Sequence, residues 1–239
     1  MKNQLFLLHF AGGSSFSFDF LKKKLDQNIS SIALELPGRG RRINEELIKS
    51  KEDAIADYCR QIVKLRNGNP FVIYGHSMGA TLGLSVVSML EKMGHFPERL
   101  IVSGNAGPGI KKKKDILRYL LDDHEFKNEL RELGGIPEEV LKDDELYEFF
   151  APIIRADFEC LEKDNFSEKG IVINTPIYAL MGTEEETCHE IENWKKFTDS
   201  DFKYRVLEGN HFFIYQHSEN IAVILKKSFS ASKKKLLGI

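Results

Sequence analysis

Ser77 is the residue whose surroundings are most typical of chemistry. It is the central residue of a Gly-x-Ser-x-Gly segment, 75–79, that joins an apolar run at 71–75 to an amphipathic stretch at 78–93. A strand that turns this sharply into a helix holds the serine in a strained backbone conformation, and side chains two residues away on either side would clash. The hydroxyl then lies above the edge of a sheet, beside the free N–H groups of a helix N-terminus. The pattern predicts a nucleophilic serine.

A glycine-rich turn between strand and helix could also bind phosphate. The dinucleotide-binding pattern requires glycines where this chain has Ser77 and Ala80, and the Gly-Lys-Ser/Thr of a nucleoside triphosphate-binding loop is absent. Both phosphate-binding interpretations are therefore excluded.

A serine hydroxyl needs a base, and the base needs an acid. In hydrolases with such a turn, the acid and then the histidine follow the serine along the chain. His211 comes directly after a predicted strand and its Glu-Gly-Asn loop, so it is expected at the same edge of the sheet as Ser77. We predict His211 as the base and keep His217 as the alternative. The other five histidines precede the later strands or lie in a polar loop.

The acid is expected in the loop that follows the preceding strand. That loop contains Glu184, Glu185 and Glu186 and no aspartate. A glutamate can serve as well as an aspartate, so residue chemistry leaves the three open. Asp157 is a candidate outside the loop.

Two backbone N–H groups are expected to stabilise a developing oxyanion. One belongs to the residue after the nucleophile, Met78, and the other to the loop after an early strand, where Ala11 precedes two glycines. Small residues there let the backbone approach a substrate carbonyl.

Apolar runs bounded by turn residues predict the elements that position these groups. Helices are expected from about 53 to 65, from 78 to 93, and from near Ser218, which is a plausible N-cap. Alternation of strands and helices predicts an α/β fold with a mostly parallel central sheet flanked by helices. Strands are expected at 4–10, 31–36, 71–75, 99–103, 176–181 and 202–207.

The stretch from about 107 to 170 interrupts the alternation. It shows no convincing strand, and it has helical spacing through Ile116, Leu120 and Leu121 and again through Leu141, Leu146 and Phe150. We predict a helical lid inserted into a single domain that spans 1–239. The lysines from Lys111 to Lys114 lie near the expected mouth of the site. They fit either a docking surface for an acidic partner or a solvated charge run.

Composition excludes several classes of function. The 239 residues carry 34 Lys and Arg against 36 Asp and Glu, a net charge of −2 that provides no basic field for nucleic acid or a membrane surface. No stretch is long enough to span a membrane, and the short first apolar run is expected to be a buried strand of a cytoplasmic protein. Three widely spaced cysteines form neither a disulfide framework nor a metal motif. We expect no metal and no cofactor.

Six motifs occur in an order that resembles a known family. They are Phe-Ala-Gly-Gly at 10–13, Glu-Leu-Pro-Gly-Arg-Gly at 35–40, Gly-His-Ser-Met-Gly at 75–79, Leu-Gly-Gly-Ile-Pro at 133–137, Phe-Phe with Arg-Ala-Asp-Phe at 149–158, and Gly-Asn-His-Phe-Phe at 209–213. Together they resemble the stand-alone type II thioesterases of nonribosomal peptide and polyketide synthesis. The resemblance extends over nearly the whole chain.

This resemblance implies an α/β-hydrolase fold with a helical lid. It implies hydrolysis of acyl or aminoacyl groups from the phosphopantetheine thiol of a carrier protein, by a monomeric enzyme that clears blocked synthetases. Ser77 and His211 match the family's motif directly, and the family's acid position falls on Glu185. The family commonly has aspartate there, so this chain departs from the pattern.

Two other functions remain as alternatives. One is an esterase or acyltransferase of the same fold that acts on small-molecule or coenzyme A esters. The other is a binding module without catalysis, which the presence of candidates for serine, histidine and acid disfavours.

Overall fold

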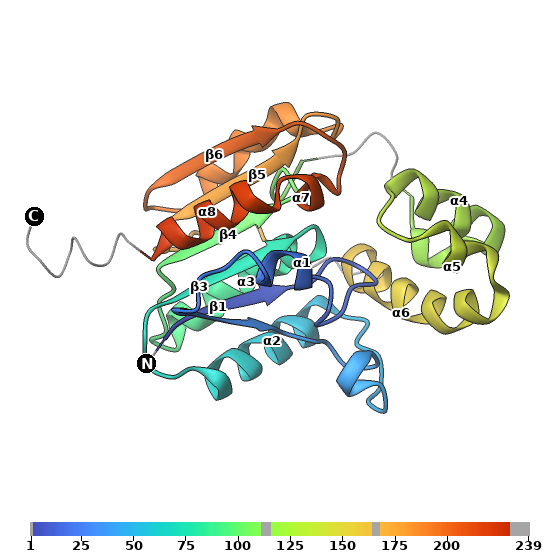
Figure 1. Ribbon diagram of the computed structural model, residues 1–239, viewed down its shortest axis with the longest axis horizontal. Helices are drawn as coiled ribbons and strands as arrows, with labels where there is room; N and C mark the ends of the chain where they lie inside the picture. The colour runs from blue at the N-terminus through green and yellow to red at the C-terminus, as the bar shows by residue number, and fades with distance from the viewer. Residues whose placement is uncertain (1, 111–115, 164–167, 230–239) are drawn as a thin grey trace, which may run out of the picture.

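The computed structural model describes residues 2–110, 116–163 and 168–229. Its centre is a six-stranded sheet in which every neighbouring pair of strands is parallel (Figure 1), with the order β2-β1-β3-β4-β5-β6. The predicted α/β fold with a mostly parallel sheet is confirmed. The strands are β1 Asn3–Leu8, β2 Ile29–Ala33, β3 Phe71–His76, β4 Arg99–Ser103, β5 Ile177–Gly182 and β6 Phe202–Leu207.

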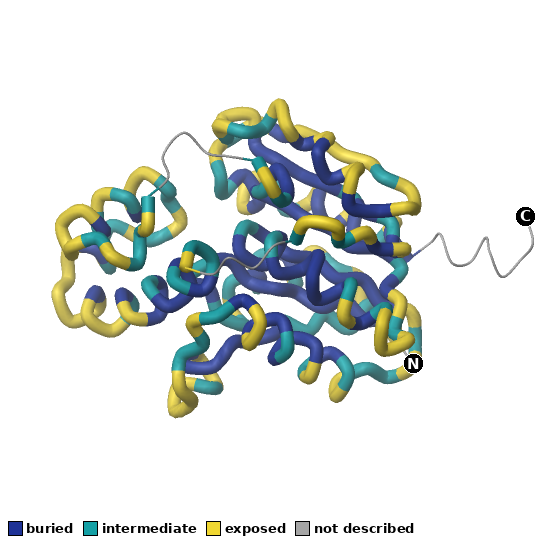
Figure 2. The backbone as a smooth tube through the Cα atoms, turned by 180° about the vertical axis from the view of Figure 1, so that it is seen from behind, coloured by how far each residue is buried: buried dark blue, intermediate teal, exposed yellow. Residues whose placement is uncertain are grey.

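Successive side chains of a strand point to opposite faces of the sheet, so the apolar strands present two apolar faces, and helices cover both. In β1, Phe6 and Leu8 belong to one apolar cluster, and Leu5 and Leu7 belong to another. The first cluster packs against α2 (Lys51–Leu65), α3 (Met78–Lys92) and the 3₁₀ segment η3 (Cys188–Phe197), and the second against α1 (Asp19–Lys22), α7 (Phe213–Gln216) and α8 (Ser218–Ser228). Figure 2 shows the central strands as mostly buried between these layers, whereas β2 is half-buried and most of β6 is exposed.

The second strand lies earlier in the chain than its apolar residues predict. The prediction of 31–36 is wrong, because β2 ends at Ala33. Leu34 and Leu36 are buried all the same, in a loop that continues to a 3₁₀ turn, η1 (Gly40–Arg42). Burial of a loop produces the same apolar pattern as burial of a strand.

Two helix starts also differ from the predictions. The helix α2 begins at Lys51, since the Ser50 side chain accepts the Asp53 N–H and caps it. Ser218 is the first residue of α8 and not its N-cap, which is His217.

A helical insertion lies between β4 and β5 and groups beside one end of the sheet (Figure 1). It contains η2 (Arg118–Leu120), α4 (Asp123–Leu133), α5 (Glu138–Lys142) and α6 (Asp144–Glu162). These helices share an apolar cluster of their own, in which Phe126 of α4 and Phe158 of α6 meet edge to face.

The structure of the insertion corrects part of the helix prediction. The periodicity through Ile116 and Leu120 is not an α-helix, because only a 3₁₀ turn lies there and Leu120 is 66% exposed. Leu146 is also exposed, on the outer side of α6. The lysines from Lys111 to Lys114 lie outside the described residues.

Within the described ranges, no helix is long and apolar enough to cross a membrane. The cysteines are free thiols, as the sequence indicates: Cys59 and Cys160 are buried, and Cys188 is partly exposed.

Candidate active site

Ser77 lies at the tip of the turn between β3 and α3. Its φ of 55° and ψ of −110° make it the single non-glycine residue with positive φ in the described part of the chain. A Cβ on Gly75 would overlap the backbone of Gly79, and a Cβ on Gly79 would overlap the carbonyl of Leu8 in β1. The predicted steric need for both glycines is therefore confirmed.

The strained turn is held by hydrogen bonds on both sides of Ser77. The Ser77 N–H donates to the carbonyl of Ser103, at the end of β4, over 2.8 Å. The Ser77 carbonyl accepts the Ala80 N–H over 3.0 Å and the Thr81 hydroxyl over 3.3 Å. The surrounding bonds overdetermine the backbone, as they must where a residue occupies a sparsely populated conformation.

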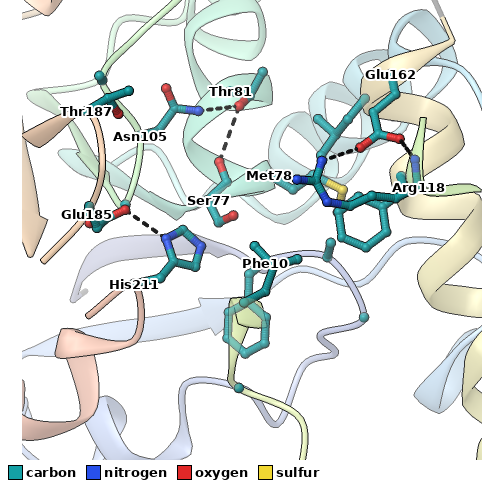
Figure 3. Close-up of a pocket in the computed structure, with 18 of the residues that line it drawn as sticks. Phe10, Ser77, Met78, Thr81, Asn105, Arg118, Glu162, Glu185, Thr187 and His211 are labelled. Carbon is teal, nitrogen blue, oxygen red and sulfur yellow. Dashed lines mark hydrogen bonds and ion pairs between the residues drawn. The ribbon is translucent and has the colours of Figure 1, made fainter. Parts of the chain in front are cut away.

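His211 and Glu185 come together from the loops after β6 and β5. The His211 Nδ1 lies 2.8 Å from a carboxylate oxygen of Glu185 (Figure 3), and since a carboxylate only accepts, Nδ1 carries the proton. The other Glu185 oxygen accepts the Gly182 N–H over 2.9 Å. This tautomer leaves Nε2 of His211 free to accept a proton, which is what a general base requires.

The structure distinguishes between the three glutamates of this loop. Glu185 is the one with a hydrogen bond to His211, and its side chain is 10% exposed. Glu184 and Glu186 are exposed. Asp157 is not placed to act as the acid, because both of its carboxylate oxygens accept hydrogen bonds from the Arg39 guanidinium.

The other histidines have different partners. His217 donates from Nε2 to the carbonyl of Glu208 over 2.8 Å. His76 is fully buried, with Nδ1 2.8 Å from the Ser103 hydroxyl. Burial, together with the nearby His211, holds the pKa of His76 well below its usual value. His76 therefore stays neutral, with its ring centroid 5.0 Å from that of His211.

Ser77, His211 and Glu185 all line one cavity of about 740 Å³. Figure 3 shows the His211 ring between Glu185 and Ser77. Met78 and Ala11 line the same cavity. Within the described part of the chain, neither the Ala11 N–H nor the Met78 N–H has an acceptor. Both backbone donors predicted for an oxyanion hole are thus available at the cavity wall.

The rest of the cavity wall comes largely from the helical insertion. Leu130, Leu133, Ile154 and Phe158 supply apolar surface. A cavity of this size, with apolar side chains on part of its wall and polar groups on the rest, is typical of sites for small organic groups.

An ion pair that sequence analysis did not identify also lines the cavity. Arg118 donates to Glu162 from its backbone N–H over 2.6 Å and from its guanidinium over 2.8 Å. Burial raises the pKa of Glu162, and Arg118 opposes this effect without cancelling it. No local motif marks the pair, because 44 residues separate its members.

No group of three or more His, Cys, Asp or Glu side chains is placed to hold a metal ion, as far as the described residues extend. Ser77, His211 and Glu185 bring a hydroxyl, an imidazole and a carboxylate to the cavity, and Ala11 and Met78 bring two backbone donors.

Comparison with known proteins gives a consistent result. The family model described as a thioesterase domain matches residues 3–229. The gramicidin S biosynthesis protein GrsT of Aneurinibacillus migulanus is 31% identical, over 90% of this chain and 84% of that protein. The crystal structure of ClbQ from the colibactin NRPS/PKS pathway superimposes with a TM-score of 0.87 at 29% identity, covering 97% of this chain and 98% of that one. YbtT, a type II thioesterase from the yersiniabactin NRPS/PKS pathway, has a TM-score of 0.85 at 26% identity, covering 96% and 94%.

Proposed function

The chain belongs to the thioesterase domain family, and we propose that it hydrolyses acyl or aminoacyl thioesters on carrier proteins through Ser77, His211 and Glu185. The observation that carries the proposal is the common cavity. It brings together Ser77, a correctly protonated His211 and the unpaired N–H groups of Ala11 and Met78.

Acylation follows from this arrangement. Nε2 of His211 accepts the proton of the Ser77 hydroxyl as the oxygen attacks the thioester carbonyl. The Ala11 and Met78 N–H groups donate to the oxygen that becomes negative. The tetrahedral intermediate then expels the phosphopantetheine thiol, to which the protonated His211 gives its proton, and His211 becomes neutral again. Glu185 stabilises the imidazolium and fixes its orientation.

Deacylation repeats the same steps with water. His211 removes a proton from a water molecule, the resulting hydroxide attacks the Ser77 ester, and His211 returns the proton to the serine oxygen. The acid is released and the enzyme is restored. The helical insertion acts as a lid whose apolar side chains hold the acyl group while the ester exists.

The names of the relatives support a carrier-bound substrate. GrsT is described as a gramicidin S biosynthesis protein, and ClbQ and YbtT come from NRPS/PKS pathways, in which intermediates travel as thioesters on carriers. In the proposed function this chain acts as a cytoplasmic monomer that removes unwanted acyl groups from such a carrier. No metal or cofactor takes part.

Turnover of matched substrates tests the proposal. One acyl group is presented on a phosphopantetheinylated carrier protein, on coenzyme A and as a p-nitrophenyl ester. We expect the highest kcat/KM for the carrier-bound form and none above background for Ser77→Ala. A fluorophosphonate probe should label the wild type and leave that variant unlabelled. Activity that persists in Ser77→Ala would refute the mechanism, and a preference for the small ester would indicate an esterase.

A further inference from the structure

A buried ion pair contacts the turn that carries the Ala11 N–H. Arg39 donates to both oxygens of Asp157, over 2.6 and 2.7 Å, and the two side chains are 2% and 1% exposed. One of these Asp157 oxygens also accepts the Gly12 N–H over 2.7 Å. Arg39 donates in addition to the carbonyl of Gly13 over 3.3 Å. The pair therefore connects the loop after β1, the loop after β2 and the helix α6.

This connection occupies the N–H group that follows Ala11 in the turn. Residues 10–13 form a tight turn closed by the Gly13 N–H, which donates to the Phe10 carbonyl over 2.9 Å. The Gly12 N–H is held by Asp157, and Gly12 has a φ of +75°. With these two donors satisfied, the Ala11 N–H, which precedes them in the turn, has no acceptor and is available to the cavity.

Packing fixes the same turn from the side of α6. A Cβ built on Gly12 would lie 2.8 Å from Cγ1 of Ile154, one turn before Asp157 on that helix. Ala11 packs against the apolar cluster of the helical insertion. The turn is thus confined between its own hydrogen bonds and α6.

A second carboxylate anchors the far end of the loop. Glu35 accepts the Ser15 N–H over 2.9 Å with one oxygen and the Arg41 N–H over 2.8 Å with the other. The loop is therefore held at Gly12 and at Ser15 by two different acids.

Stability alone gives no reason for so buried an ion pair. Removing two charges from water is expensive, and apolar residues of similar volume often stabilise a fold as well or better. Neither Arg39 nor Asp157 lines the cavity, so neither touches the substrate. Their distinguishing contact is the one with the turn that carries Ala11.

We propose that Arg39 and Asp157 are positioning residues of the oxyanion hole: they hold the Gly12 N–H so that the Ala11 N–H faces the developing oxyanion. The inference rests on the proposed function, since it assigns the Ala11 N–H to that reaction. It makes the inner half of α6 part of the catalytic framework as well as part of the lid.

Two double variants separate this role from a purely structural one. Arg39→Met with Asp157→Leu replaces the pair by apolar side chains and removes the acceptor of the Gly12 N–H. Arg39→Gln with Asp157→Asn also removes both charges but keeps an amide oxygen that can accept the same N–H. Neither variant leaves a charge buried without a partner, so both are designed to fold. Arg99→Met with Asp201→Leu is the control, because Arg99 begins β4 and Asp201 precedes β6, so this pair lies at the opposite ends of the strands from Ser77.

The expected result is a selective loss of transition-state stabilisation. Deleting an oxyanion donor outright costs about 10²–10³-fold in kcat, so a displaced donor should cost about 10–100-fold in the apolar variant. A trifluoromethyl ketone analogue, which forms a tetrahedral adduct with the serine, should bind more weakly by a similar factor. A thioether analogue without a carbonyl should bind within about threefold of wild type. The amide variant should recover most of the kcat, and the control should match the wild type.

Three outcomes overturn the inference. The first is wild-type kcat in a folded apolar variant. The second is an equal loss of thioether and ketone binding, which indicates a structural role. The third is no recovery in the amide variant. If the pair variants do not fold, a glycolate residue in place of Gly12 deletes only the N–H that Asp157 accepts, and an unchanged kcat there refutes the inference. Activity in Ser77→Ala would instead refute the proposed function.

Discussion

Replacing Glu185 by glutamine changes one atom at the centre of the proposed triad. In the native chain, one carboxylate oxygen of Glu185 accepts a hydrogen bond from His211 Nδ1 at 2.8 Å, and the other accepts the Gly182 N–H at 2.9 Å. In Glu185→Gln, the oxygen of the amide can keep the contact with Gly182. Its NH2 group then faces Nδ1, which must lose its proton to accept a hydrogen bond. The proton moves to Nε2, and His211 can no longer act as a base towards Ser77.

The size of the expected loss in kcat follows from the change of the His211 tautomer. A wrong tautomer of the base costs about 10⁴-fold in kcat in a serine hydrolase with intact geometry, which corresponds to about 5.5 kcal/mol of transition-state stabilisation. Glu185→Asp provides a second measure. Its carboxylate is shorter by one carbon–carbon bond of about 1.5 Å, so it cannot reach Gly182 and His211 together unless the loop moves. We expect Glu185→Asp to lose more activity than Glu184→Ala or Glu186→Ala and less than Glu185→Gln.

The assay is single-turnover hydrolysis of one acyl-carrier substrate. Glu184→Ala and Glu186→Ala are matched controls, because these exposed glutamates lie in the same loop. Thermal unfolding of every variant shows whether the fold is retained. If a folded Glu185→Gln variant keeps more than a tenth of the wild-type kcat/KM, Glu185 is not the acid and the tautomer argument fails.

Three further predictions concern the framework of the site. Gly79→Ala should destabilise the fold by about 3 kcal/mol in urea unfolding, because its Cβ overlaps a backbone carbonyl that cannot move aside; a wild-type midpoint would contradict the tight turn. Gly135→Ala should lower kcat about tenfold, because its Cβ overlaps the ring of Phe212, which follows the proposed base His211. Gly134→Ala has a similar positive φ, but its Cβ lies 3.8 Å from Phe212, so its effect should be smaller. Burial and a neighbouring guanidinium lower the pKa of His9 from 6.5 to about 4, so the unfolded chain binds the extra proton first as the pH falls. The free energy of unfolding should decrease by about 3 kcal/mol from this group between pH 6.5 and 4, and His9→Asn should remove that contribution from urea titrations.

The fold was predictable where apolar pattern and topology agree. Arg99–Ser103 is a strand with the expected limits, since a parallel strand covered on both faces is a continuous apolar run with clear ends. The pattern failed at residues 34–36, which are buried without being a strand. Apolar spacing reports burial, and it reports secondary structure only where the two coincide.

Within the insertion, N-cap residues indicate where the helices begin better than the apolar spacing does. Asp122 caps α4 by accepting the Glu125 N–H, and Asp143 caps α6 by accepting the Leu146 N–H. An aspartate followed three residues later by a residue within a helical pattern is a recognised start signal. Those caps, in place of the periodicity through Ile116, would have located both helices.

The candidate site was predictable only where its residues have local signatures. Ser77 and its glycines form one short motif, and His211 follows a strand through a short loop. The choice among the three adjacent glutamates depends on which side chain turns towards His211. The local sequence carries no signal for that orientation. The contact of Arg39 with Asp157 spans 118 residues, so no local pattern could have indicated it.

The helical insertion departs from β4 and returns at β5, and these two strands pair directly with each other. The sheet is therefore complete without the insertion, and we expect that protein engineering can exchange part of this segment without breaking a strand pairing. The contact of Asp157 with the turn at Gly12 sets the boundary of a graft. Residues 124–150 can be replaced to alter the walls of the cavity, while 153–162 should stay together with Arg118, the partner of Glu162, and Asp123, the partner of Arg155. Pro152 is a natural junction, because a helix already lacks one hydrogen bond at a proline.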